Sequence, residues 1–389
     1  MTTGGAGSGR EAYDVAVVGG GPAGSAAALM LSRAGRRVLL AEANESNAFK
    51  IGEALPPAAR PLLGDMGLWD GLAADGHLPC RGNLSAWGAQ RLNETAFIFD
   101  PNGHGWHLDR ARFDWRLREA ARLSGSETYE ATALKRLTRS PRGGWQLTLA
   151  GPRGETRASC RWLVDATGRR SALARRQGAR LRQDDRLVAF FALFRRSAND
   201  AAPDEDSRTL IEAAADGWWY TALLPSKRRV VVYLTDADLI SPRALCEKES
   251  YLSLLGRTEH IRARLAAHGY RMEDAPRGAA AHSARLDSFD GEGWLAVGDA
   301  ALAFDPLSSQ GMLTALFTGM EAGNALDAHL SGDTDAVNRY RLRLATIYEA
   351  YLRNLATYYS FEARWPDRDF WRRRHDGAAR RGRPGHSGM

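Results

Sequence analysis

The stretch from Tyr13 to Glu42 constrains the fold more than any other part of this sequence. It reads as a short apolar strand, a glycine turn, a helix and a second strand. Gly19, Gly21 and Gly24 form the pattern G-x-G-x-x-G. The first glycine permits a tight turn, the second lets a pyrophosphate approach the backbone, and the third lets the helix lie close to the sheet. The stretch therefore predicts a dinucleotide-binding turn.

An acidic residue stands at the end of the second strand of this unit. Glu42 follows the glycines by roughly the 20 residues that the fingerprint requires, and its carboxylate can accept hydrogen bonds from both hydroxyls of a ribose. A glutamate here argues against a 2′-phosphate. The alternative, an ordinary glycine-rich strand–helix turn, does not require this acid. The cofactor-binding residues predicted from this part of the chain are Gly19, Gly21, Pro22, Ala23, Gly24, Glu42 and Ala43.

Length and composition predict an ordinary soluble protein with one large domain or two closely joined domains. The chain has 389 residues, of which 44% are hydrophobic and 25% charged. We expect no membrane span, because no apolar run approaches roughly 20 residues, and no signal peptide. Three widely spaced cysteines predict a reducing, cytoplasmic location, and the histidines and cysteines show no metal-binding spacing.

The positive charge is concentrated at the C-terminal end. The chain has a net charge of +7, and residues 364–389 hold eight arginines and three aspartates. A basic tail of this kind can contact nucleic acid or an acidic partner. We favour a solvated, frayed terminus and expect no nucleic-acid partner.

Further stretches along the chain indicate that the dinucleotide is a flavin. Arg110 opens a helix, where its guanidinium can reach a phosphate or a ribityl chain. Asp165 and Asp299 each end a buried strand, and the second can hold a ribityl hydroxyl. A long helix then begins near Gly311, and its N-terminus can stabilise negative charge on a reduced flavin. The further predicted cofactor contacts are Glu53, Arg110, Leu134, Asp165, Gly168, Asp299, Pro306, Gly311 and Met312.

Taken in order, these motifs resemble the group A flavin monooxygenases. The motifs are the glycine turn, Arg110-x-x-Phe113-Asp114, Asp165-x-x-Gly168, and Gly298-Asp299 with Pro306. The family includes the para-hydroxybenzoate hydroxylase fold, the flavin-dependent halogenases and the geranylgeranyl reductases. The resemblance covers about residues 12–330. It implies FAD as cofactor, O2 as co-substrate, a C4a-(hydro)peroxyflavin and electrophilic oxygen transfer.

The predicted fold is α/β, with a three-layer FAD-binding domain interleaved with a mainly antiparallel substrate sheet, followed by C-terminal helices. We expect residues 1–11 to be a disordered leader. The other predicted units are the FAD-binding domain (12–82, 103–182 and 286–330), the substrate domain (83–102 and 183–285), a helical segment (331–363) and the basic tail (364–389).

Within the superfamily, the chain looks most like the halogenase-like branch, on Gly52-Glu53-Ala54, residues 305–312 and Gly217-Trp218-Trp219-Tyr220. By that resemblance a halogenase needs a Trp-x-Trp-x-x-Pro motif, from which this stretch departs. It also needs a lysine some way after Glu53, and none occurs between Lys50 and Lys135. We therefore predict against halogenation. The sequence is most similar to maturation flavoproteins of lysine and glycine oxidases and of quinohemoprotein amine dehydrogenase, which hydroxylate a tryptophan in a partner protein.

The prediction is therefore an FAD-dependent aromatic monooxygenase. Its leading substrate is a peptidyl tryptophan, and the alternative is a small indole or phenol. Strand alternation places Trp218 and Tyr220 on one face and Trp219 on the other, where a core role is an equal alternative. Glu53 is a weak candidate acid or base, and a loop carboxylate is its alternative role. The predicted substrate pocket is Trp218, Trp219, Tyr220, Ser308 and Ser309, with His107 and Arg81 as further candidates.

The electron source stays open at this point. The sequence has no second G-x-G-x-x-G for a nicotinamide cofactor, so electrons come either from NAD(P)H bound transiently or from a partner flavin reductase. Other functions remain as alternatives: a small-molecule hydroxylase or halogenase of a biosynthetic pathway, a geranylgeranyl-reductase-like enzyme, or a flavoprotein scaffold without turnover. Oxygen consumption coupled to a hydroxylated product would distinguish a hydroxylase from a geranylgeranyl-reductase-like enzyme and from a scaffold without turnover.

Overall fold

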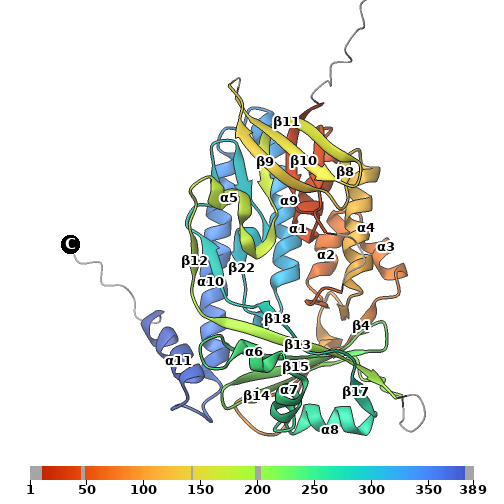
Figure 1. Ribbon diagram of the computed structural model, residues 1–389, viewed down its shortest axis with the longest axis vertical. Helices are drawn as coiled ribbons and strands as arrows, with labels where there is room; N and C mark the ends of the chain where they lie inside the picture. Colours follow the sequence, from red (N-terminus) through yellow and green to blue (C-terminus); the bar gives the residue numbers. More distant parts are fainter. Residues whose placement is uncertain (1–10, 45–48, 142, 198–202, 382–389) are drawn as a thin grey trace, which may run out of the picture.

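A mainly parallel sheet forms the upper half of the computed structural model, which describes residues 11–44, 49–141, 143–197 and 203–381 (Figure 1). Its central strand, β1 (Glu11–Val18), pairs in parallel with β2 (Val38–Ala41) and with β11 (Gly154–Asp165). Val15, Ala16 and Val17 are fully buried, as expected of a strand covered on both faces. The remaining strands are β8 (Glu127–Tyr129), β9 (Ala133–Arg139), β10 (Trp145–Gly151), β20 (Asp290–Gly291) and β21 (Trp294–Ala296).

The helix that follows the glycine turn is held by two long helices from later in the chain. α1 (Pro22–Arg33) packs against α4 (Arg110–Leu123) and α9 (Gly311–Leu330). The approach to α9 is close because a Cβ at Gly319 would lie 2.1 Å from the Ala23 carbonyl oxygen. The N-termini of α1 and α9 are thus brought to the same part of the molecule.

A second, mainly antiparallel sheet forms the lower half (Figure 1). One of its faces packs against three short helices, around Trp219, Tyr233 and Tyr251. The other face carries Trp218 and Val232 and is covered in part by the C-terminal helices. The strands are β5 (Gly82–Ala86), β6 (Asn93–Ala96), β13 (Leu187–Arg196), β14 (Thr209–Ala214), β15 (Gly217–Leu223), β16 (Arg229–Asp236), β17 (Tyr270–Met272) and β18 (Arg277–Ala280). The helices on the first face are α6 (Pro242–Leu245), α7 (Lys248–Leu255) and α8 (His260–Ala267).

Short elements connect the two sheets. One three-stranded sheet joins β3 (Ala54–Leu55), β7 (Gly105–His107) and β4 (Leu78–Cys80), and another joins β12 (Leu181–Gln183), β19 (Ala284–Leu286) and β22 (Leu302–Ala303). Three further short helices are α2 (Ala59–Asp65), α3 (Trp69–Ala74) and α5 (Ala172–Arg176). The α/β fold with an antiparallel sheet and C-terminal helices is confirmed, while the domain boundaries stay a prediction. In the described ranges, none of the helices is both long and apolar enough to cross a membrane.

The C-terminal part departs from the sequence-based expectation. α10 (Ala336–Ser360) is followed by α11 (Asp369–Arg381), which lies beside the second sheet (Figure 1). Phe370 and Trp371 are completely buried there, and Arg374 pairs with Asp236 of β16 at 2.9 Å. The expectation of a solvated, frayed terminus is therefore wrong for residues 369–376, where α11 packs against the second sheet. Arg373 and Arg374 are both used in ion pairs with Asp236 of the second sheet.

Candidate active site

A cavity of about 330 Å³ lies where the two halves of the molecule meet. One wall is formed by the glycine turn and the start of α1, and another by the loop that leads into α9. The remaining wall is the face of the second sheet that carries Ile211, Trp218, Tyr220, Val232 and Leu234. The cavity therefore joins the predicted cofactor-binding turn to a mainly apolar surface.

The glycine turn has the geometry that a bound pyrophosphate needs. Gly19 has a φ of +113°, and a Cβ there would lie 2.1 Å from the Ala166 carbonyl oxygen. A Cβ at Gly24 would lie 1.9 Å from the Gly19 carbonyl oxygen, whereas one at Gly21 would meet no atom within 4 Å. Gly21, Pro22, Ala23 and Gly24 line the cavity, so backbone N–H groups at the start of α1 are open to an anion.

Glu42 is buried beside the turn, just outside the cavity lining. Its Oε2 accepts a hydrogen bond from the backbone N–H of Gly20 at 2.7 Å, and its Oε1 accepts from the backbone N–H of Asn44 at 2.8 Å. Ala43 is exposed next to it. Glu42 thus braces the turn in this structure, and its contact with a ribose stays a prediction.

Asp165 is the clearest departure from the predicted contacts. Its carboxylate is completely buried and does not line the cavity. Oδ2 accepts from the backbone N–H groups of Leu173 and Ala174 at 2.9 and 2.8 Å, and Oδ1 accepts from the N–H and the hydroxyl of Thr167. Asp165 therefore caps α5 and holds the loop that carries Gly168, which does line the cavity.

Replacing Asp165 by asparagine should lower the free energy of unfolding by about 2 kcal/mol, because an amide NH2 group would face N–H donors that then lose their acceptor. Chemical denaturation of the purified variant tests this. A matched change at Asp274, an exposed loop residue, should leave the stability unchanged. Equal stability of Asp165→Asn and the wild type would contradict the capping role.

Arg110, Arg169 and Asp299 form one charged part of the cavity wall. Arg110 donates to the carbonyl oxygens of Ile51 and Gly52 at 3.0 and 2.9 Å and pairs with Asp114 at 3.2 Å. Asp299 lies 3.4 Å from Arg169, and burial raises the pKa of its carboxyl group. Arg110, Arg169 and Asp299 can hold phosphate and hydroxyl groups of a dinucleotide.

The loop before α9 supplies the next section of wall. Pro306, Ser309, Gly311 and Met312 line the cavity, while Ser308 turns its hydroxyl back to the carbonyl oxygen of Asp305 at 2.8 Å. Free N–H groups at the start of α9 can stabilise negative charge. Leu134 lies in β9, outside the cavity lining, so its predicted cofactor contact is not supported by its position.

The aromatic strand behaves as alternation predicts. Trp218 and Tyr220 line the cavity, and the indole N–H of Trp218 donates to the Tyr359 hydroxyl at 3.2 Å. Trp219 points to the opposite face, where its ring lies 4.6 Å from Tyr233. The pocket assignment of Trp219 is therefore corrected to a core role.

Glu53 and Tyr220 form a polar pair on the cavity wall. The Glu53 side chain is 2% exposed, and burial raises the pKa of its carboxyl group. It is hydrogen-bonded to Tyr220 and to the backbone N–H of Gly52, the latter at 3.2 Å. Burial also raises the pKa of the Tyr220 hydroxyl, so this group stays protonated as a donor.

The two further pocket candidates lie elsewhere. His107 is buried behind the wall, with one ring nitrogen 2.8 Å from the Leu223 carbonyl oxygen and the other 2.9 Å from the Thr209 hydroxyl. Burial lowers its pKa to about 4, so the ring is neutral and structural at physiological pH. Arg81 is exposed and does not line the cavity.

Several lining residues were missed by the sequence analysis. Alternation along β14 would have found Thr209 and Ile211, which share one face of that strand. Arg169 stands next to the predicted Gly168, and Asp305 next to Pro306. No feature of the sequence would have identified three alanines of the lining, because small apolar side chains carry no chemistry of their own. They are Ala279, Ala280 and Ala281.

These features define a flavin-dependent oxidoreductase: an anion-binding glycine turn, a charged wall for a dinucleotide, a second helix N-terminus and an adjoining apolar wall. The chain belongs to the family described as FAD binding domain, whose model matches residues 12–351. The residues present fit FAD, because the space above Gly21 is open to a pyrophosphate beside Arg110 and Asp299.

Comparison with known proteins gives the same class. The chain is 33% identical over 378 residues to the putative FAD-dependent oxidoreductase LodB of Marinomonas mediterranea, covering 94% of this chain and 97% of that protein. It is similar to the myxobacterial chondrochloren halogenase CndH, with a TM-score of 0.84, 25% identity and coverage of 94% and 86%. It shares the fold of the peptidyl tryptophan dihydroxylase QhpG, with a TM-score of 0.75, 23% identity and coverage of 93% and 78%.

Proposed function

We propose that this protein uses FAD and O2 to hydroxylate an electron-rich aromatic ring, and that the ring is a tryptophan side chain of a protein or peptide. The observation that carries the proposal is the cavity between the two halves of the molecule, in which the predicted cofactor wall faces a mainly apolar wall that carries the polar pair Glu53 and Tyr220. Bound FAD, once reduced, supplies the electrons that convert O2 into an electrophilic oxygen donor.

The protein's own contribution is positioning, exclusion of water and control of charge. The start of α1 and the pair Arg110 and Asp299 would hold the dinucleotide, and the start of α9 would stabilise negative charge beside it. Ile211, Trp218 and their neighbours on the second sheet would hold a flat ring in a dry site. Burial raises the pKa of the Glu53 carboxyl group, which favours its protonated form beside Tyr220.

The choice of a peptidyl tryptophan over a small molecule is supported by similarity. LodB, a putative FAD-dependent oxidoreductase, matches 94% of this chain, and QhpG, a peptidyl tryptophan dihydroxylase, has the same fold. A small indole or phenol remains the alternative substrate. NAD(P)H or a partner reductase would supply the electrons.

Halogenation is the second candidate, since CndH shares the fold and 25% of the sequence. The cations of the described cavity wall are arginines, and a lysine is not among them. Lys50, the lysine nearest to Glu53 in the sequence, pairs with Asp114 at 3.0 Å and does not line the cavity. An arginine cannot supply the neutral amine that would capture hypohalous acid, because it does not lose its proton in a protein.

Mass spectrometry on the reaction products tests the proposal. The FAD-loaded protein is reduced, mixed with isotopically labelled O2 and incubated with a tryptophan-containing peptide, with chloride or bromide present. We expect oxygen from labelled O2 in the tryptophan and no halogenated peptide. A halogenated product would establish the second candidate. Oxygen incorporation into free indole or phenol but not into peptide would select the small-molecule alternative.

Replacing Glu53 by glutamine should lower the rate of hydroxylation about 100-fold while FAD stays bound, because the pair with Tyr220 loses its proton-holding member. Quantifying product per bound flavin checks this. Glu94→Gln provides the matched control, since Glu94 is exposed at the edge strand β6. Wild-type turnover in Glu53→Gln would leave Glu53 as a structural loop carboxylate.

A further inference from the structure

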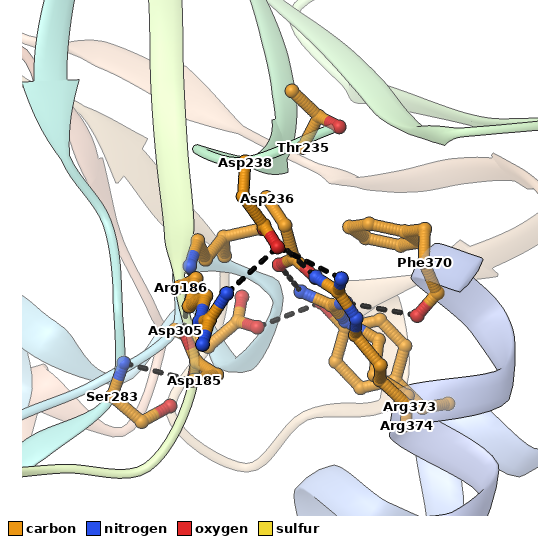
Figure 2. Close-up of polar contacts among 12 residues, drawn as sticks. Asp185, Arg186, Thr235, Asp236, Asp238, Ser283, Asp305, Phe370, Arg373 and Arg374 are labelled. Carbon is orange, nitrogen blue, oxygen red and sulfur yellow. Dashed lines mark hydrogen bonds and ion pairs between the residues drawn. The ribbon is translucent and has the colours of Figure 1, made fainter. Parts of the chain in front are cut away.

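A second cavity, of about 350 Å³, lies behind the first and meets it at one residue, Asp305. Of the described residues that line the two cavities, Asp305 is the one that both share. The second cavity reaches the surface, because Asp184 and Arg186 in its wall are exposed. Its far side is closed by α11, from which Arg373 and Arg374 point toward Asp236 and Asp238 (Figure 2).

The carboxyl group of Asp305 is held in a fixed orientation between the two cavities. The side chain is 1% exposed. Oδ1 accepts from the backbone N–H of Leu307 at 2.9 Å, and Oδ2 accepts from the Tyr359 hydroxyl at 2.7 Å. That hydroxyl also accepts from the indole N–H of Trp218, which lines the first cavity. A chain of hydrogen bonds therefore leads from the aromatic wall through Tyr359 to Asp305.

Asp305 has the chemistry to take up and release protons near neutral pH. Burial, with the charge of Asp185 as a further cause, raises its pKa to about 7. The groups around it come from every neighbouring segment: Asp184, Asp185 and Arg186 before β13, Asp236 on β16, Tyr351 and Tyr359 on α10, and Arg373 and Arg374 on α11, with Arg169 and His282 near Phe304.

We propose that Asp305 passes protons from the second cavity to the first, and that Tyr359 positions its carboxyl group for this transfer. The proposal rests on the proposed function, because oxygen chemistry of this kind takes up a proton. Hydroxylation follows ArH + O2 + FADH⁻ + H⁺ → ArOH + FAD + H2O. The two electrons come from the reduced cofactor, one oxygen atom enters the ring and the other leaves as water. With FAD and the aromatic ring in the first cavity, this proton would need a route through the protein.

The transfer needs two steps at one carboxyl group. A hydronium ion in the second cavity gives its proton to the Asp305 carboxylate and remains there as water. The carboxylic acid then gives this proton, in the first cavity, to the oxygen atom that will leave as water. The other acids of the second cavity, Asp184, Asp185 and Asp236, do not line the first. Arg374 and Asp236 neutralise each other at 2.9 Å and so keep the charge behind Tyr359 balanced.

The test uses the FAD-loaded protein without any aromatic substrate. In that case reoxidation is FADH⁻ + O2 + H⁺ → FAD + H2O2, which also takes up a proton. The protein is reduced anaerobically and mixed with oxygenated buffer between about pH 5 and about pH 9, in H2O and in D2O. We expect the wild-type rate to change through a midpoint near the pKa of Asp305, about 7, and to fall in D2O.

Asp305→Asn should lose this midpoint and slow reoxidation at least about tenfold. Asp305→Glu should restore a midpoint, and Tyr359→Phe should move it to higher pH, because the carboxylate loses a donor that stabilises its charged form. Asp184→Asn, in the same cavity wall, should keep the wild-type profile. If Asp305→Asn does not retain FAD, the glutamate and phenylalanine variants decide. Wild-type pH profiles and D2O effects in these variants would overturn the proposal.

Thermal unfolding provides a readout that does not involve turnover. The pKa of Asp305 is about 7 in the folded protein, above its ordinary value of 3.8. The stability that the protonated group contributes is therefore present at low pH and lost as the pH rises through about 7. Between pH 3.8 and about 7, the Tm of the wild type should therefore fall relative to that of Asp305→Asn. Parallel curves of Tm against pH would contradict the assignment of this pKa to Asp305. Neither the reoxidation assay nor the Tm measurement contains an aromatic substrate. A failure to hydroxylate tryptophan would therefore contradict the proposed function without affecting the test of Asp305.

Discussion

Gly24→Ala is expected to abolish FAD binding. A Cβ at this position would lie 1.9 Å from the Gly19 carbonyl oxygen and 2.8 Å from the Cβ of Ala166, and the nearer atom belongs to backbone that cannot rotate away. α1 would have to shift off the sheet, and the glycine turn would move with it. Such overpacking costs about 1–3 kcal/mol or more, so the turn would no longer present its N–H groups to a pyrophosphate. The flavin absorbance of the purified protein measures the loss.

Two further glycines separate folding from binding. Gly64→Ala, in α2, adds a Cβ that meets no atom within 4 Å, so this variant should fold and bind FAD as the wild type does. Gly21→Ala should also fold, since Gly21 has a φ of −74° and open space around it, but its Cβ would enter the cavity and weaken FAD binding. Stoichiometric FAD in Gly24→Ala would show that the close packing of turn and helix is not required.

Trp371→Ala is expected to lower the free energy of unfolding by about 3–5 kcal/mol. The indole ring is completely buried under the second sheet, 5.4 Å from the ring of Trp87, and its N–H donates to the Ala214 carbonyl oxygen at 3.0 Å. Removing the ring leaves a cavity beside Trp87, whose ring packs against that of Trp218 in the wall of the active-site cavity. Urea denaturation followed by far-UV circular dichroism gives the change.

Trp115→Ala is the matched control for this prediction. Its side chain is 47% exposed on α4, so its loss should change the stability by less than about 1 kcal/mol. If Trp371→Ala proved no less stable than Trp115→Ala, α11 would not be an integral part of the fold. The order of the two effects therefore tests the packed C-terminal segment directly.

The parts of the fold that could be predicted from the sequence are those set by local pattern. The strand, glycine turn and helix from Tyr13 onward follow from buried aliphatic residues and from glycines at fixed spacing. The split of Trp218 and Trp219 onto opposite faces follows from the two-residue period of a strand. The family was predicted because four such motifs occur in a fixed order.

What could not be predicted depends on contacts between distant segments. Asp165 ends a strand just as Asp299 does, but only the packing of α5 turns one carboxylate inward and leaves the other in the cavity wall. The arginine-rich end of the chain looked solvated because its partners, Asp236 and Asp238, lie far away in the sequence. The role of Asp305 between two cavities depends on Tyr359, which is 54 residues further along.

The strands of the first sheet come from distant parts of the chain, and this affects how the protein folds during translation. β1 ends at Val18, yet β21, two strands away from it across β11, begins at Trp294. At about 5–20 residues per second, roughly a quarter of a minute to a minute passes between the synthesis of these strands. During that interval the N-terminal strand and α1 lack α9, and their apolar surface stays open to chaperones or to aggregation. The glycine turn is therefore made early but completed late, and a flavin can be captured only near the end of translation.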